Sequence, residues 1–237
     1  MKRLAHTLIA AALALIATPA PAAVGYVNTV FSPGNSLFGN PLQNAPNHLS
    51  NLFTLPPEGT AVGLWNPATL SFGSVSVFQG GTWSVDFTLA PGTGAMLTTP
   101  APFTNTFVGE VLAPDGSAWS GTSVPPPAYS GPDGVYLWSS KFPAVLGSAS
   151  AIGSVWEYIV GRAPHQGEQF GWLDLGQNLQ ITTFLGGAWT NGDPALGVGQ
   201  AGFFNIGPVP IPEPAAASLL ALAFGVFGLA RAGRRNG

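Results

Sequence analysis

The stretch Phe78-Gln-Gly-Gly-Thr-Trp-Ser-Val-Asp-Phe-Thr-Leu89 decides the fold class of this 237-residue chain. From Trp83 to Leu89 every second residue is apolar, and the residues between them are Ser, Asp and Thr. A period of two is that of a β-strand with one buried face. Before this segment, the pair Gly80-Gly81 favours a tight hairpin turn, because both central residues of such a turn need positive φ angles. The stretch therefore predicts a β-hairpin with a strand over 83–89.

The same pattern occurs again later in the chain, as Phe184-Leu-Gly-Gly-Ala-Trp189. Both copies read F-x-G-G-x-W, and each is followed by L-x-x-G and small residues that lead into an apolar segment. A glycine ahead of a buried strand permits close approach of two backbones. We interpret the repeat as one β unit used twice, over 24–112 and 128–207, with a linker over 113–127 that contains three consecutive prolines.

Short strand-like segments separated by turns fill the rest of this region. Turn formers such as Pro114-Asp-Gly116 and Pro132-Asp-Gly134 recur at roughly ten-residue spacing. This spacing is typical of an all-β sandwich or barrel rather than of an α/β fold. One short helix is expected over 46–52, with Asn47 as its N-cap. Further strands are expected over 24–31, 61–65, 72–78, 103–111, 135–138, 155–160, 179–184 and 202–206.

The charge distribution argues against nucleic acid as a partner. Residues 24–210 carry two basic and nine acidic residues, and two minus nine gives a formal charge of −7. Such a body repels phosphate backbones. The same residues include all seven tryptophans, which indicates a folded core rather than disorder. Because the chain has no cysteine, disulfides, thiolate metal sites and cysteine nucleophiles are excluded.

Motifs for metal chemistry are weak. The ends of His165-Gln-Gly-Glu168 resemble a ligand pair, but Pro164 and Gly167 disfavour the helix that would place both on one face. We therefore interpret this segment as a solvated hairpin loop. Zinc needs three or four ligands, and His48 is the only other histidine of the body. No metal and no cofactor are expected.

Carboxylates and tryptophans leave two alternatives open. Glu157, Glu168 and Asp174 lie near aromatic residues and are the candidates for a glycosidase pair. Acids on the solvated face of a strand explain Glu157 and Asp86 without catalysis, and no nucleophile elbow or phosphate-binding motif occurs, so we predict that the chain is not an enzyme. Four tryptophans could stack on sugar rings, although core packing explains them as well: Trp119, Trp138, Trp156 and Trp172.

The N-terminus has the order of a secretory signal. Lys2 and Arg3 precede an apolar segment over 7–17, and Ala20-Pro-Ala22 supplies small residues for cleavage. The apolar segment is too short to span a bilayer. We predict a signal peptide over 1–23, with Ala20, Ala22 and Ala23 at the cleavage site and cleavage after Ala22 or Ala23.

The last thirty residues have three consecutive parts. A proline-rich stretch over 208–214 cannot continue a helix. The uncharged apolar run over 215–230 would span about 24 Å as a helix, a little less than a bilayer core. Arginines then resist translocation and hold that end in the cytoplasm. We predict one transmembrane helix over 215–230, stopped by Arg231, Arg234 and Arg235.

These three parts resemble the PEP-CTERM sorting signal of Gram-negative bacteria, with Pro212-Glu213-Pro214 as the motif. The resemblance implies an exosortase as partner, for which Pro212, Glu213 and Pro214 are recognition residues. It also implies anchoring in the cell envelope membrane, then release to the cell surface or extracellular matrix. The class is linked to exopolysaccharide and to biofilm formation.

The body is similar to ectodomains found ahead of such signals. Shared segments include Gly25-Tyr-Val-Asn28, Asn40-Pro-Leu42, Trp65-Asn66, Leu89-Ala-Pro-Gly-Thr-Gly94 and Phe107-Val-Gly-Glu-Val111. The similarity covers 25–112 well and 130–207 loosely, and it implies no enzymatic activity. We expect a non-catalytic exported surface or matrix protein. A carbohydrate-binding module and a secreted glycoside hydrolase are the alternatives.

Overall fold

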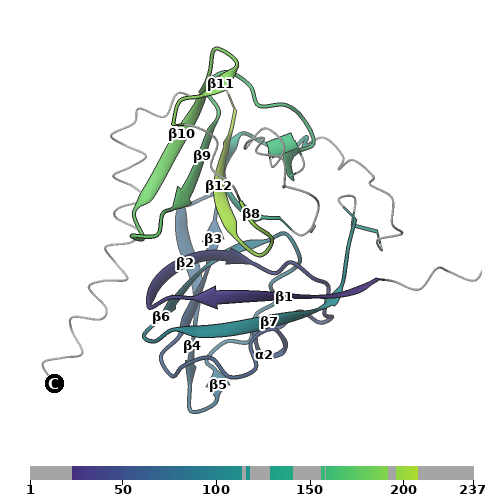
Figure 1. The fold of residues 1–237 in the computed structure, drawn as a ribbon, viewed down its shortest axis with the longest axis vertical. Helices are drawn as coiled ribbons and strands as arrows, with labels where there is room; N and C mark the ends of the chain where they lie inside the picture. The colour runs from purple at the N-terminus through teal and green to yellow at the C-terminus, as the bar shows by residue number, and fades with distance from the viewer. Residues whose placement is uncertain are drawn as a thin grey trace, which may run out of the picture.

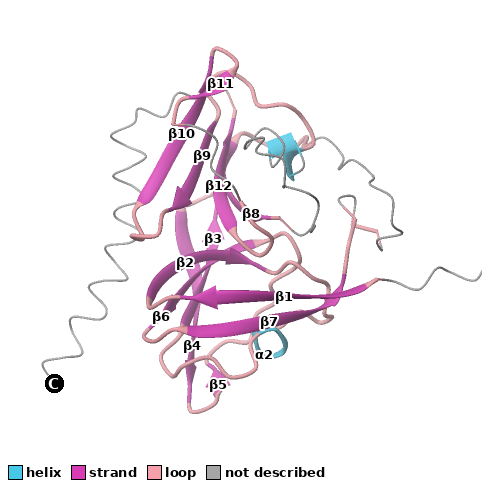
Figure 2. Cartoon of the chain, in the orientation of Figure 1, coloured by secondary structure: helices cyan, strands magenta, loops and turns pink. Residues whose placement is uncertain are grey.

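In the computed structural model, the residues that can be described are 23–113, 116–117, 129–140, 156–157, 159–191 and 196–207. They form the strands β1 to β12, the four-residue helix α2 (Leu49–Leu52) and a helical turn near residues 156–160 (Figure 2). The prediction of an all-β body is therefore confirmed. The predicted signal peptide over 1–23 and the predicted transmembrane helix over 215–230 lie outside these residues, except for Ala23 at the end of the signal peptide.

A first five-stranded antiparallel sheet is built from the N-terminal half of the body. Its order is β2-β6-β3-β4-β5. Gly80 and Gly81, with φ angles of 62° and 78°, form the turn between the last two strands, which pair Phe78 with Trp83. The predicted glycine hairpin is thus confirmed. The strands are β2 (Gly34–Gly39), β3 (Ala61–Asn66), β4 (Ser71–Gln79), β5 (Thr82–Trp83) and β6 (Gly94–Thr99).

A second five-stranded antiparallel sheet is built from the C-terminal half, in the order β11-β10-β9-β12-β8. Gly186 and Gly187 have φ angles of 60° and 85° and form its hairpin, which pairs Phe184 with Trp189. Figure 1 shows this sheet above the first. The strands are β8 (Gly134–Ser139), β9 (Gln169–Leu173), β10 (Leu179–Leu185), β11 (Ala188–Trp189) and β12 (Ala201–Ile206).

The two sheets share one pairing register. Each strand of the first sheet has a counterpart at the same place in the second, with β2 matching β8, β3 matching β9, β4 matching β10, β5 matching β11 and β6 matching β12. The pairs Leu37–Met96, Val62–Leu97 and Ala61–Val77 correspond to Leu137–Phe203, Phe170–Phe204 and Gln169–Thr183.

The sheets also contact each other reciprocally. Gly39 N donates to Gly199 O and Ser139 N donates to Gly92 O, each over 3.0 Å. Gly39 and Ser139 occupy equivalent positions at the ends of β2 and β8. Gly92 and Gly199 are also equivalent, because the N–H of Gly92 donates to the carbonyl of the residue directly after β2 and the N–H of Gly199 donates to that of the residue directly after β8. Reciprocal bonds of this kind mean that an approximate two-fold axis relates the two sheets.

Side chains alternate between three hydrophobic layers. Phe38, Leu97 and Val62 point from the first sheet toward a ribbon of β1 (Val24–Phe31) and β7 (Phe103–Glu110), which crosses that sheet in Figure 1. Leu37, Met96, Leu137 and Phe203 fill the layer between the sheets. The outer face of the second sheet carries the third layer: Trp156, Val160, Phe170, Trp189, Leu196, Phe204 and Ile206.

The strand predicted over 83–89 is wrong beyond Trp83. Ser84 N donates to Val77 O, as in a strand. The next two ladder hydrogen bonds are accepted by side chains, since Val77 N donates to the Ser84 hydroxyl and Val85 N donates to the Ser76 hydroxyl. Side-chain oxygens thus replace backbone carbonyls, so the chain leaves the sheet and Val85 is exposed.

Two further elements differ from the prediction. The helix over 46–52 starts only at Leu49, and the N-cap is His48, without a side-chain bond. Asn47 has a φ angle of 59° and is buried, and its amide bonds Asn40, Asn44 and Gln43. The strand predicted over 155–160 is also wrong, because the residues described there are helical.

Candidate functional site

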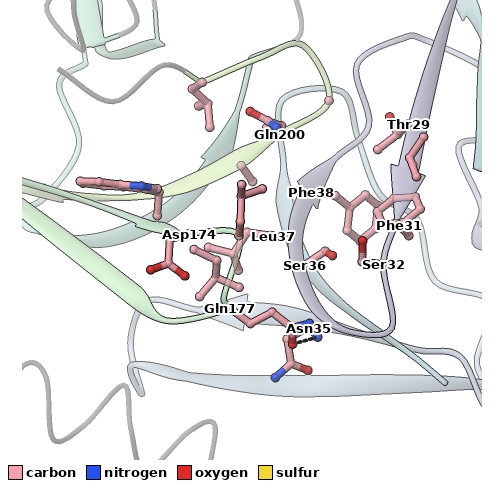
Figure 3. A pocket seen from close by; sticks show the side chains of 17 residues that line it. Thr29, Phe31, Ser32, Asn35, Ser36, Leu37, Phe38, Asp174, Gln177 and Gln200 are labelled. Atoms are coloured by element: carbon pink, nitrogen blue, oxygen red, sulfur yellow. Dashed lines mark hydrogen bonds between the residues drawn. The ribbon is translucent and has the colours of Figure 1, made fainter. Parts of the chain in front are cut away.

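A cleft of about 480 Å³ lies between the two sheets. The end of β1 and the strand β2 form one wall, and the turn between β9 and β10 forms the other, as Figure 3 shows. Asn35, Ser36 and Leu37 come from the first sheet, whereas Asp174 and Gln177 come from the second. The site is therefore assembled from residues far apart in sequence.

Gln177 connects the two walls. Its side-chain oxygen accepts a hydrogen bond from Asn35 N at 2.8 Å, and its side-chain nitrogen donates to Pro33 O at 2.6 Å. Gly34, between these partners, has a φ angle of 101°, and a Cβ atom there would overlap the Gln177 amide. Glycine is thus required for both the backbone angle and the close approach.

Among the described residues that line the cleft, Asp174 is the only charged one. Backbone bonding from Asn178 N, at 2.9 Å, is the main cause that lowers its pKa, and bonds from Gln180 and Asn178 side chains lower it further. The carboxylate is therefore ionised at neutral pH and holds the tight turn in which Gln177 adopts a φ angle of 62°.

Apolar and polar groups are mixed along the cleft. Trp172 and Leu196 provide apolar surface, while Ser32, Ser36 and the amide of Gln200 provide hydroxyl and amide groups. The Gln200 oxygen accepts from Gly197 N at 2.8 Å, which leaves its NH₂ group as a donor. A tryptophan beside neutral polar groups and one carboxylate suits a hydroxyl-rich ligand better than an anionic one.

The structure distinguishes tryptophans that pack in the core from those that line the cleft, which the sequence alone did not. Trp156 is fully buried and packs on Trp189 and Phe204 with ring centroids 5.5 and 5.4 Å apart, so core packing explains it. Trp138 is half-buried and stacks on Tyr136, away from the cleft lining. Of the three candidates that the structure describes, Trp172 alone lines the cleft; Trp119 lies outside the described residues.

Residues 165–168 form a turn in which His165 is exposed, as predicted, but Glu168 is not solvated, and the prediction is wrong for that residue. The side chain is fully buried and accepts two bonds from the Arg162 guanidinium, at 2.6 and 2.9 Å. The backbone N–H groups of His165 and Gly207 donate to it at 2.6 and 3.1 Å. Burial raises the pKa of Glu168, but these hydrogen bonds outweigh burial and lower it overall.

The other candidate carboxylates do not join Glu168. Glu157 is exposed on the helical turn, and Asp174 lies in the cleft, whose lining includes neither glutamate. Within the part of the chain that the structure describes, no three His, Asp or Glu side chains are close enough to hold a metal ion.

The predicted sorting and anchoring residues fall outside the described ranges: Ala20, Ala22, Pro212, Glu213, Pro214, Arg231, Arg234 and Arg235. Ala23 is described, and its carbonyl accepts from Val111 N at 2.8 Å. Among the helices that can be described, none is long and apolar enough to cross a membrane.

No family model, curated protein or solved structure matches this chain.

Sequence analysis missed Asn35, Gln177 and Gln200 as cleft residues. The polar turn from Asp174 to Asn178 is visible in the sequence, but its contact with Asn35 joins residues separated by more than half of the body. Such a pairing depends on how the two sheets dock, which no local pattern encodes.

Proposed function

We propose that this protein is an exported, non-catalytic surface or matrix protein that an exosortase sorts through Pro212-Glu213-Pro214. The observation that carries the proposal is the order of the last thirty residues, in which a proline-rich stretch precedes an uncharged apolar run and then arginines. In this scheme the run over 215–230 anchors the chain in the envelope membrane until processing releases the body.

The end of the described body supports this order. β12 ends at Ile206, and the buried N–H of Gly207 is bonded to Glu168. Prolines at 208, 210, 212 and 214 follow at once. Alternate prolines favour an extended backbone without internal hydrogen bonds. A stiff extended segment of this kind would hold the motif clear of the body, where a membrane enzyme can reach it.

The experiment compares processing of the tagged full chain in a Gram-negative host with and without its exosortase. Replacing Pro212, Glu213 and Pro214 by Ala should abolish the shorter product. Replacing Pro208 and Pro210 by Ala, which alters the same stretch but not the motif, should leave that product in place. Processing that is unaffected by the motif change, or by removal of the exosortase, would overturn the proposal.

Carbohydrate binding is a second candidate function, and the cleft favours it. Its volume of about 480 Å³ suits a ligand of one or two sugar rings, and its mixed lining suits hydroxyl groups. Binding to matrix polysaccharide fragments should then be lost in Trp172→Ala and Gln200→Ala and kept in Trp138→Ala. If Trp172→Ala retains both its thermal stability and its binding, the cleft is not the sugar site.

We also infer that the body arose by duplication of one β unit. The shared strand order, the shared register and the two equivalent glycine hairpins support this origin. Two units related by an approximate two-fold axis resemble a symmetric dimer joined into one chain.

A further inference from the structure

As far as the structure describes the chain, the strand β1 has one hydrogen-bonding edge without a partner. It pairs with β7 on one side over all eight residues, from Val24 with Glu110 to Phe31 with Phe103. No other described strand pairs with it. An edge strand of this length presents a row of free N–H and C=O groups to any incoming strand.

The hydrogen bonds on the other edge of β7 determine which residues of β1 direct their N–H and C=O groups to the open edge. Gln43 and Glu110 exchange two hydrogen bonds, so the peptide groups of Glu110 point away from β1. Val24, opposite Glu110, is consequently in a pair without mutual hydrogen bonds, and its own peptide groups point outward. Because the pattern alternates, Tyr26, Asn28 and Val30 also direct their N–H and C=O groups to the open edge.

The same four residues form an exposed and largely apolar face. The exposed fractions of Val24, Tyr26 and Val30 are 72%, 74% and 73%. Val108, opposite Tyr26 on β7, is exposed as well. The strand contains no charged residue and no proline. Proteins usually protect long edges with such residues, and β1 lacks that protection.

The other edges of the described sheets are short or occupied. β5 and β11, at the outer ends of the two sheets, have two residues each. β2 and β8 end in the reciprocal bonds between the sheets. The outer edge of β7 is occupied at Glu110 by Gln43. Among the described strands, β1 is thus the longest edge that is open over its whole length.

We propose that β1 is a self-association site, at which a second copy of this chain pairs antiparallel with β1. In the register that pairs all four outward residues, Val24 of one copy lies opposite Val30 of the other, and Tyr26 lies opposite Asn28. Each pairing occurs twice, because a two-fold axis relates the two copies. Apolar faces meet apolar faces and no like charges approach, so the edge is complementary to itself. The result is one four-stranded sheet, β7-β1-β1-β7, shared by two copies.

Two features of the chain favour a second copy as the occupant. The predicted signal peptide ends at Ala23, so its removal would place the mature N-terminus directly before β1. An interface of one strand from each copy is below about 1,200 Å², which is typical of weak association. Confinement to one membrane face or matrix raises the effective concentration enough for weak pairing to persist.

Disulfide crosslinking tests the register, because the chain has no cysteine of its own. Full-length copies carrying Val24→Cys are mixed in detergent with differently tagged copies carrying Val30→Cys and then oxidised. Directly opposed, bonded residues of antiparallel strands have Cα atoms about 5.5 Å apart, which is within the range of Cα distances that a disulfide spans. A mixed-tag disulfide is expected. Copies carrying Leu55→Cys, which is similarly exposed but lies outside every described strand, measure random collision.

A pair of charge variants provides the matched control. Tyr26→Lys with Asn28→Lys places cations opposite cations in the proposed dimer, and should reduce the Val24–Val30 crosslink at least tenfold. Tyr26→Glu with Asn28→Lys removes the same two side chains but places opposite charges together, and should retain the crosslink. The proposal fails if crosslinking does not exceed the Leu55→Cys level, or if both charge variants behave alike. Neither failure bears on sorting, which the tail determines.

Discussion

Glu168→Gln should destabilise the body by about 3 kcal/mol, the low end of the cost of breaking a buried ion pair. The native carboxylate accepts four hydrogen bonds, two from Arg162 and one each from the backbone of His165 and Gly207. An amide of the same shape keeps only one accepting oxygen, so donors on its other side lose their partner. Arg162 is partly exposed and can be hydrated, which limits the cost.

The pH dependence of this variant has a defined sign. The pKa of Glu168 in the folded body is below its ordinary value. Its contribution is therefore fully present above the unfolded pKa, about 4.3, and is lost as pH falls through the folded value. The wild-type chain should lose more stability than Glu168→Gln as the pH is lowered below about 4.5, so the gap between the two narrows in acid.

Thermal unfolding of the full chain in mild detergent, followed by tryptophan fluorescence, measures both effects. For a body of this size 1 kcal/mol shifts Tm by about 2–4 °C, so the variant should melt about 6–12 °C lower at pH 7. Glu157→Gln, at an exposed glutamate near the same unit, is the control and should shift Tm by less than about 2 °C. A Glu168→Gln chain that melts with the wild type at pH 7 would refute the buried ion pair.

Four further substitutions test the cleft, the core and the hairpin, each by the same melting assay. Gly34→Ala should cost at least about 2 kcal/mol, because its φ angle is left-handed and the Gln177 amide occupies the Cβ position, whereas Gln177→Ala alone should cost only about 1–2 kcal/mol for two lost bonds. Phe107→Ala should cost about 3–5 kcal/mol, since the ring is fully buried under the β1–β7 ribbon, and a smaller loss would mean that this layer is loosely packed. Gly80→Ala, in the open hairpin turn, should cost about 1 kcal/mol through its positive φ alone, and no change would argue against that turn.

Local chemistry made the hairpins predictable. Two consecutive glycines allow one compact turn, and the turn then fixes which residues lie opposite each other, so Phe78 and Phe184 meet Trp83 and Trp189. The strand predicted after Trp83 failed for an equally local reason. Apolar and polar residues do alternate in this segment, but serine hydroxyls replace backbone groups in the hydrogen bonds of the ladder. A period of two in the sequence does not reveal that replacement.

Long-range pairing was beyond the sequence. β1 and β7 were both predicted as strands, yet nothing in either segment indicates that they pair with each other across most of the first unit. Glu168 was misread for a related reason. Arg162 is only six residues away, but Gly207, directly after β12, is 39 residues further along the chain, and only the folded chain brings its N–H to the same carboxylate.

The two units differ most in what covers their outer faces. In the first, β6 leads through Pro100-Ala-Pro102 into β7, and the ribbon then buries Phe38 and Leu97. In the second, β12 is followed by the similar sequence Pro208-Val-Pro210, and then by the predicted sorting tail. Trp138 stands where the first unit has Phe38, so a larger ring occupies the position that the ribbon covers in the other unit. The place in the chain that is followed by a covering strand in the first unit is thus followed by the predicted anchor in the second.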